Sequence, residues 1–263
     1  MAELDRPAPD LWKQLRRFTP ARIGLGRVGA SLPTQALLAF DLAHAQARDA
    51  VHAAFDARFV ASELQSCGLP EPVIVASRAR DRMEYLLRPD LGRSLDDVSR
   101  SRLRAVAAPA HPCDLAIVVA DGLSAMAPAR HATPLLRKFL ALKSAQPGDW
   151  NLLKNITVVV ANQARVALGD EIGDLLGAPA AIVLIGERPG LSSPDSLGVY
   201  LTWAPRRGRT DAERNCISNI RPEGLSFADA ARRLLSLLAE AHRLQLSGVA
   251  LKDSSDDASR WLP

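Results

Sequence analysis

The sequence predicts an α/β protein with a Rossmann-like, open and mostly parallel sheet, helices on both faces of that sheet, and a helical region before it. Three observations predict this class. Short apolar runs without polar alternation recur along the later chain, as is typical of strands buried on both faces. Segments of helical periodicity separate these runs. The first 65 residues are helical in pattern. The alternation predicts right-handed crossovers between parallel strands.

The N-terminal region, residues 1–65, has the pattern of helices. Asp10 is suited to cap a short helix that ends near Phe18, because a residue before proline avoids the helical conformation and Pro20 follows. Pro33 is suited to a first helical turn. The Ala/Leu-rich segment after it has one apolar and one charged face, which indicates a long amphipathic helix.

The remainder of the chain, residues 66–250, is expected to form the sheet domain, and residues 251–263 a polar tail. The predicted strands cover residues 73–77, 115–121, 156–161, 180–186 and 198–203. The predicted helices cover residues 95–107, about 132–145, 168–177 and 226–246. Gly177 is placed where a glycine commonly ends a helix.

Composition and charge exclude several classes of protein. Hydrophobic residues make up 48% and charged residues 24% of the 263, which are ordinary globular values. The net charge is +4 and the arginines are scattered, so no basic stripe for nucleic acid is seen. No apolar stretch is long enough to span a membrane. The three cysteines form no C-x-x-C pair, which fits a reducing cytosol.

Long segments follow the predicted strands at the edge where open parallel sheets bind ligands. They begin after residues 120, 161, 185 and 203, and those after the last two exceed the 2–6 residues usual for such connections. Their length indicates a binding surface, with simple long turns as the alternative. Glu187 is interpreted either as part of a solvated turn or as a carboxylate that accepts hydrogen bonds from a ligand. Cys216 is interpreted as a small buried apolar residue.

The motifs do not indicate a self-sufficient enzyme. Gly24, Gly26 and Gly29 spell G-x-G-x-x-G, but no buried strand precedes them and Pro33 starts the helix later. None of the five histidines forms a metal or nucleophile–base pattern. A cleft-like edge without a visible catalytic group is more natural for a cofactor-holding subunit. An NAD(P)-binding oxidoreductase that uses the Gly24–Gly29 loop stays open as an alternative, as does a non-catalytic scaffold.

Several blocks of sequence resemble the small (light) subunits of ethanolamine ammonia-lyase, in the family's order and spacing. These blocks cover residues 15–51, 86–95, 118–124, 185–203 and 216–220. The resemblance implies an adenosylcobalamin-dependent ammonia-lyase that converts ethanolamine to acetaldehyde and ammonia by radical chemistry. It also implies a large (heavy) partner subunit that holds the substrate, in a dodecamer of six large and six small subunits.

The resemblance carries the family's cobalamin contacts onto three positions of this chain, namely Val166, Glu187 and Cys216. It assigns no catalytic and no metal-binding residue here. One departure is Ala164, where relatives commonly have glycine before the Arg-Val pair. No histidine lies in an Asp-x-His-x-x-Gly motif, which predicts base-on cobalamin.

The expected location is cytoplasmic. Some relatives carry a long polar N-terminal extension that is linked to packaging in a bacterial microcompartment. Only ten residues precede Leu11 in this chain, so residence in a microcompartment stays open.

Overall fold

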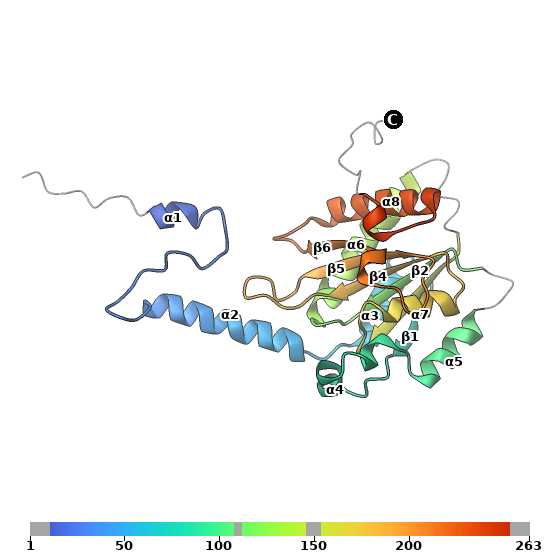
Figure 1. The fold of residues 1–263 in the computed structure, drawn as a ribbon, viewed down its shortest axis with the longest axis horizontal. Helices are drawn as coiled ribbons and strands as arrows, with labels where there is room; N and C mark the ends of the chain where they lie inside the picture. The colour runs from blue at the N-terminus through green and yellow to red at the C-terminus, as the bar shows by residue number, and fades with distance from the viewer. Residues whose placement is uncertain (1–10, 108–111, 146–153, 253–263) are drawn as a thin grey trace, which may run out of the picture.

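Within residues 11–107, 112–145 and 154–252, the part that the computed structural model describes, the chain forms one six-stranded sheet (Figure 1). Its order is β1-β3-β2-β4-β5-β6. The strands are β1 (Val73–Ala76), β2 (Leu115–Ala120), β3 (Ile156–Asn162), β4 (Ala180–Gly186), β5 (Leu197–Trp203) and β6 (Arg214–Ile220). The first four strands are parallel, whereas β5 runs antiparallel to both β4 and β6.

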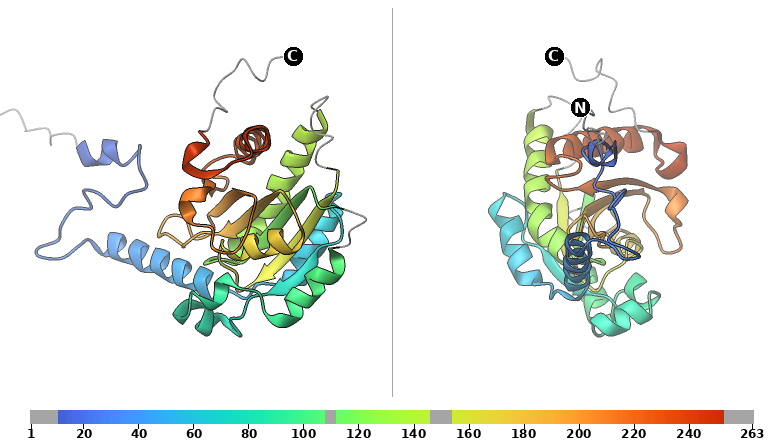
Figure 2. Two further views of the ribbon diagram at one scale, coloured as in Figure 1. Left: turned by 45° about the vertical axis from the view of Figure 1, so that its right-hand side comes forward. Right: turned by 90° about the vertical axis from the view of Figure 1, so that its left-hand side faces the viewer.

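Helices cover both faces of the sheet (Figure 2). One face carries α3 (Ala57–Ser66), α6 (Met126–Ala145) and α8 (Phe227–Leu244). The other face carries α5 (Asp97–Val106) and α7 (Leu168–Leu175). Short elements complete the body, namely α4 (Arg82–Leu87) and the 3₁₀ turns η1 (Leu91–Arg93), η3 (Asp211–Glu213) and η4 (Gly248–Ala250). None of the described helices is long and apolar enough to cross a bilayer.

The first two helices project away from this body (Figure 1). They are α1 (Leu11–Leu15) and α2 (Thr34–His52). No residue of α1 is buried, and only Ala43 and Ala50 of α2 are buried. The Gly24–Gly29 motif lies in the connection between them, and the described residues before it form no strand. The nicotinamide alternative therefore lacks the strand–turn–helix unit that it requires.

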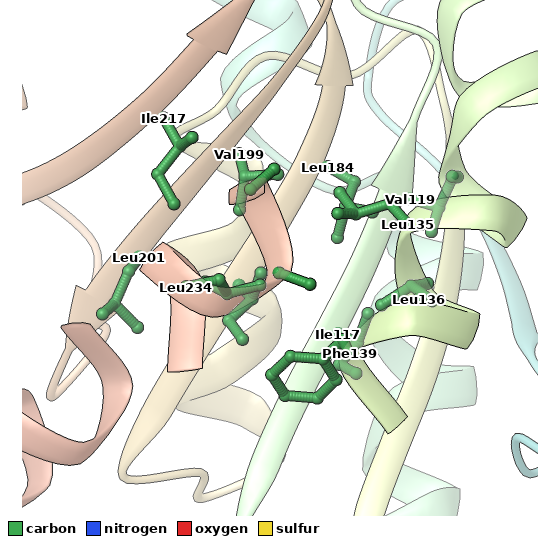
Figure 3. Close-up of a cluster of buried hydrophobic side chains, with 14 of the residues drawn as sticks. Ile117, Val119, Leu135, Leu136, Phe139, Leu184, Val199, Leu201, Ile217 and Leu234 are labelled. Atoms are coloured by element: carbon green, nitrogen blue, oxygen red, sulfur yellow. The ribbon is translucent and has the colours of Figure 1, made fainter. Parts of the chain in front are cut away.

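The larger core lies between the sheet and the helix pair α6 and α8 (Figure 3). Phe139 and Leu136 of α6 face Ile117 of β2, and Leu234 of α8 lies against the β5 side, where Leu201 projects. All five side chains are at most 1% exposed. Burying a side chain of this size stabilises the fold by about 1.5–3 kcal/mol. The unbroken apolar runs of the sequence are explained by burial of both sheet faces.

The prediction of an open, mostly parallel α/β sheet with helices on both faces is confirmed, and each predicted strand is present. The interpretation of residues 204–220 as one long loop is wrong, because residues 214–220 form β6. This strand lies at the sheet edge and its polar and exposed positions break the apolar run. It therefore lacks the signal that marks the central strands.

A second correction concerns the edge at which the loops lie. Because β5 is antiparallel to β4, the segment after residue 203 leaves the sheet at the opposite edge from Glu187. The connection from β4 to β5 contains no helix, and parallel neighbours need a crossover of a dozen or more residues. The short helix-free spacing of residues 187–196 was the available signal for an antiparallel pair.

The helices follow the predictions with shifted ends. The helix expected at about 132–145 begins at Met126 and continues through Pro134. The N-terminal region contains a further helix, α3, whose apolar side belongs to the core of the sheet domain. A boundary near residue 65 stays a prediction. Asp10 and residues 253–263 of the expected tail lie outside the described residues.

The ends of β2 and β4 are held in direct backbone contact. A Cβ atom added to Gly122 would lie 2.2 Å from the carbonyl oxygen of Gly186, and Gly122 has a φ of +58°. A Cβ atom on Gly186 would lie 2.0 Å from the carbonyl oxygen of Ser124. Leu123 N–H also donates to the Gly186 carbonyl at 2.9 Å. This edge therefore has no room for a side chain at either glycine.

Gly122→Ala is expected to destabilise the fold more than Gly177→Ala. Both glycines have a left-handed φ, +58° and +64°, but nothing lies within 4 Å of a Cβ on Gly177. Gly177→Ala, the control, is therefore expected to lower the free energy of unfolding by only about 1–2 kcal/mol, the cost of a left-handed φ in alanine. Gly122→Ala is expected to lose about 1–3 kcal/mol more, because the added Cβ atom displaces backbone. Urea denaturation measures both values, and equal losses would contradict the proposed backbone contact.

Candidate functional site

The carboxyl ends of β2 and β3 form a topological switch point. After β2 the chain passes to α6 on one face, and after β3 it passes to α7 on the other. The two loops therefore diverge between neighbouring strands, which is where open α/β sheets bind ligands. Ala161, Ala120 and Ile185 are paired across β3, β2 and β4, and Glu187 lies two residues beyond this row.

Asp121, directly after β2, connects the two diverging loops. Its carboxylate accepts hydrogen bonds from the backbone N–H groups of Gly122 (2.9 Å), Gln163 (2.9 Å) and Ala164 (3.0 Å). Arg82 lies 3.5 Å from the same carboxylate. Burial raises the pKa of Asp121, and the amide donors and Arg82 oppose that rise. A single buried side chain thus fixes the backbone at the switch point.

The side chains of Arg82 and Arg165 pack on the Tyr85 ring, and this group supports the loop after β3. The guanidinium carbons of Arg82 and Arg165 lie 4.8 Å and 4.2 Å from the ring centre of Tyr85. The Tyr85 hydroxyl donates to the carbonyl of Ala164 at 3.1 Å, and burial raises its pKa. Ala164, the departure from the family pattern, therefore has both its backbone N–H and its carbonyl bound. The path of this loop is fixed even with a methyl group at that position.

Gln163 holds an unusual conformation beside Ala164. Its φ is +52°, which is rare for a residue with a side chain. Its side-chain oxygen Oε1 is buried and has no hydrogen-bond partner among the described residues, as is also true of Arg165 Nε. Unpaired buried polar groups are costly and are rare in folded proteins. The switch point therefore contains polar atoms that the described chain alone does not satisfy.

Glu187 is held by two partners just beyond β4. Its Oε2 accepts a short hydrogen bond from the Ser196 hydroxyl and a second, at 3.2 Å, from the backbone N–H of Asn219. The other oxygen, Oε1, faces Gly198, where a Cβ atom would lie 2.9 Å away. Both hydrogen bonds use Oε2, so Oε1 is left as an acceptor at this edge.

The donor on Asn219 is aimed by a bulge in β6. Leu197 pairs with Ile220 and Val199 pairs with Ile217, so two residues of β6 lie opposite the single Gly198. Asn219, within the bulge, has a φ of +58°. Bulges of this kind are common near functional sites because they redirect one residue. Here the redirected backbone N–H reaches Glu187 from a strand two positions away in the sheet.

Cys216 lies on β6 directly opposite Tyr200 of β5. Its interpretation as a small buried residue is wrong, because it is exposed on the edge strand. The surrounding protein atoms nevertheless raise the pKa of the Cys216 thiol, against a hydrogen bond with the Tyr200 hydroxyl that lowers it. The pKa of Tyr200 is raised mainly by burial, and further by the nearby Cys216 and Glu187. Glu187, Tyr200 and Cys216 therefore form one polar cluster, in which thiol and phenol are neutral at pH 7.

Val166 lies on the β3 side of the same sheet face. It packs against the core cluster beneath α5 and α7, as does Tyr200. The structure thus places the three expected residues on one face, with Glu187 and Cys216 as neighbours and Val166 in the adjacent switch-point loop. Asp121, Ser196, Tyr200 and Asn219 were missed by sequence reasoning. Only Asp121 had a signal, as an acid immediately after a buried strand.

The loop that carries Glu187 is anchored at its far end by Asp195. Arg130 lies 3.1 Å and His131 Nε2 lies 3.3 Å from Asp195 Oδ2. Burial raises the pKa of Asp195, but hydrogen bonds and charge from Arg130 and His131 outweigh it and lower the pKa overall. The Ser124 hydroxyl also donates to the Pro194 carbonyl at 2.8 Å. Residues 187–196 are thus fastened to the body at both ends.

The sheet order, the helices on both faces and the switch point define an α/β protein of the doubly wound class. Within the described ranges, no group of three or more His, Cys, Asp or Glu side chains is arranged to hold a metal ion. Residues 9–252 match the protein family described as "Ethanolamine ammonia-lyase light chain (EutC)". The chain belongs to this family.

Curated relatives support the assignment across almost the whole chain. Proteins named "Ethanolamine ammonia-lyase small subunit" are 57% identical in Pseudomonas syringae pv. tomato and 58% identical in Azotobacter vinelandii. The first alignment covers 95% of this chain and 86% of the relative, and the second covers 94% and 90%. A Xanthomonas campestris relative of the same name is 58% identical over 95% of this chain and 90% of its own.

Gly198→Ala is expected to displace the Glu187 carboxylate with little loss of stability. The added Cβ atom would meet Oε1, the far end of a flexible side chain, at 2.9 Å. The free energy of unfolding is expected to change by about 1 kcal/mol or less, as alanine replaces glycine in a strand. A crystal structure of the variant would test the displacement, and an unmoved carboxylate would contradict this geometry.

Proposed function

We propose that this chain, as the small subunit of ethanolamine ammonia-lyase, holds adenosylcobalamin at the carboxyl edge of its sheet. Family membership makes the enzyme a carbon–nitrogen lyase with a larger partner subunit. The proposed reaction converts ethanolamine to acetaldehyde and ammonia. The single observation that carries the proposal is the position of Glu187, which two other segments fix with one oxygen left as an acceptor.

The residues at this edge fit the chemistry of cobalamin. A corrin ring carries primary amide arms, which are strong N–H donors and need acceptors. Glu187 Oε1 and the unpartnered Gln163 Oε1 are acceptors of that kind, and Val166 adds an apolar contact. Gly198 has no side chain and so leaves room for the Glu187 carboxylate itself. These features support binding of the corrin periphery rather than of the cobalt ion.

The chain's own residues bind and orient, and they do not react. When bound, the cofactor supplies the radical chemistry, as is usual for enzymes of this kind. Asp121 fixes the loop that presents Gln163 and Val166, while Ser196 and Asn219 fix Glu187. Cys216 remains a thiol at neutral pH, so we assign it a packing and weak hydrogen-bonding role without covalent chemistry.

The remaining parts of the proposal concern the assembly. We propose that the large (heavy) subunit holds the substrate and closes over the cofactor from the other side, in a dodecamer of six large and six small subunits. Adenosylcobalamin is proposed to bind base-on. We propose a cytoplasmic location, and residence within a bacterial microcompartment stays an open alternative.

Glu187→Ala is expected to weaken cobalamin binding by the assembled complex about 5- to 160-fold, which corresponds to loss of a buried polar contact of about 1–3 kcal/mol. Glu187→Gln should retain part of the affinity, because its amide oxygen still accepts. Glu71→Gln, an exposed acid before β1, is the matched control. Spectroscopic titration of the co-expressed complex with adenosylcobalamin measures the dissociation constant. An unchanged constant in both Glu187 variants would contradict the proposed contact.

A triple change of Val166, Glu187 and Cys216 to alanine distinguishes the proposal from the scaffold alternative. Loss of cobalamin affinity and of ammonia release in a complex that still assembles is the expected result. Full retention of both would favour a scaffold that never touches the cofactor. Fluorescence titration with NAD(P)H tests the oxidoreductase alternative, and we expect no saturable binding.

Base-on binding predicts that the lower axial nitrogen of the cofactor comes from dimethylbenzimidazole. The electron paramagnetic resonance spectrum of the cob(II)alamin form should therefore be unchanged when the protein histidines are labelled with ¹⁵N. A spectrum in which the nitrogen coupling pattern changes with that label would show histidine ligation. The same complex with unlabelled histidine is the control.

A further inference from the structure

The N-terminal arm, defined as residues 11–52, exposes apolar side chains that the body does not cover. Of 17 exposed large apolar residues on the described chain, ten lie in the arm. They are Leu11, Trp12, Leu15, Phe18, Val28, Leu32, Leu37, Leu38, Phe40 and Leu42. The other seven are spread over five elements of the body and the segments beside them, and only Met83 and Leu87 are neighbours, which is normal for a surface. A concentration of this size on one segment marks an interaction surface.

The helix of the arm is apolar on more than one side. Leu38 and Leu42 share one side of α2 by their spacing of four residues, while Leu37 and Phe40 lie on another. Their exposed fractions run from 40% to 62%. Asp41, Arg48 and Asp49 interrupt the apolar surface, but exposed apolar side chains on two sides of a helix normally pack against another element. Such a helix is also marginal in water without tertiary packing. A single flat contact would leave some of these apolar side chains uncovered, so the partner contacts α2 on more than one side.

The arm also carries a strong positive charge along its outer half. Residues 11–33 contain five cationic side chains and no acidic one. The cations are Lys13, Arg16, Arg17, Arg22 and Arg27. Two arms of this kind would repel one another if paired side by side at their outer halves. The charge therefore favours a different polypeptide whose apolar groove has an acidic rim.

The base of the arm and the connection before α2 are both hydrogen-bonded to the edge of the sheet where the cofactor is proposed to bind. At the base, Arg82 Nε donates to the carbonyl of Val51 at 2.6 Å, and Arg82 Nη1 donates to that of Gly122 at 2.8 Å. In the connection before α2, Arg22 Nη2 donates to the carbonyl of Leu191 at 3.5 Å, in the loop that Glu187 begins. Figure 1 shows the arm on the same side of the body as that loop.

We propose that the arm is the docking element of this chain for the large subunit, which encloses α1 and α2 in an apolar groove with an acidic rim. The inference rests on the proposed function for the partner's identity, and goes beyond it by naming the surface. A partner that closes over the cofactor edge necessarily meets the arm, because the arm leaves the body there. The arm thus extends the contact between subunits beyond the cofactor.

The test uses the full chain co-expressed with the large subunit. Leu38→Ser with Leu42→Ser is expected to weaken binding between the subunits at least tenfold, as measured by tagged pull-down and analytical ultracentrifugation. Leu87→Ser with Val249→Ser is the control, because these side chains are at least as exposed, at 71% and 83% against 62% and 61%, but lie on the body. Arg17→Glu with Arg27→Glu should weaken binding as well, and its effect should shrink as salt rises.

Three outcomes would overturn the proposal. The arm variants could bind the large subunit as tightly as the control does. The serine variants could instead abolish self-association of the chain alone, which would make the occupant a second copy. Hydrogen exchange of residues 11–52 could be equally slow in the lone chain and in the complex, which would mean that the arm packs on its own body. Expected instead is slow exchange only in the complex.

The experiment separates failure of this inference from failure of the proposed function. Glu187→Ala is expected to assemble normally and to lose cobalamin affinity, whereas the arm variants are expected to lose assembly first. At subunit concentrations high enough to restore the complex, the arm variants should bind cobalamin with the dissociation constant of the unchanged complex. A loss of affinity in the fully assembled arm variants would place the arm in cofactor binding instead.

Discussion

The buried carboxylate of Asp121 is the interaction on which the candidate site depends. Where β2 and β3 end, the chain leaves in opposite directions, and the backbone N–H groups of both loops need acceptors. Asp121 supplies them with one side chain, and Arg82 balances its charge while binding the last turn of α2. Removing either the Asp121 carboxylate or the Arg82 guanidinium would leave its buried partners unpaired. The loss of stability in such a case is typically larger than the contribution of an ordinary hydrogen bond.

This arrangement gives the carboxyl edge of the sheet a fixed backbone and a fixed carboxylate. For the proposed role of holding a cofactor in one orientation, the useful property of this edge is rigidity. Glu187 is fixed through Ser196 and Asn219, and the loop that bears it is anchored through Asp195. Segments from β3, β4 and β6 converge on one face of the sheet. Under the proposed function, the carboxyl edge of this sheet is one half of a composite site whose other half belongs to the large subunit.

The central sheet was predictable from sequence because burial on both faces leaves an unbroken apolar run. The strand β6 was not, because its exposed face interrupts that run. Val166 and Glu187 could be placed at the ligand edge because each follows a parallel strand. Cys216 could not, because its strand was unseen and its neighbour Tyr200 lies across an antiparallel pair. The hydrogen bond from Asn219 to Glu187 depends on a bulge in β6, and no local sequence pattern shows that this bulge lies opposite Gly198.

The same bulge has a consequence for the chain before it meets a partner. As the last strand, β6 has a row of backbone groups that a second sheet could otherwise extend, which is a common start of fibrous aggregates. The irregular pairing near Asn219 twists one end of that row. At the other end the side-chain amide of Asn215 donates to the carbonyls of Gly248 and Leu251, which holds η4 beside the strand. A free subunit is thereby protected against edge-to-edge polymerisation.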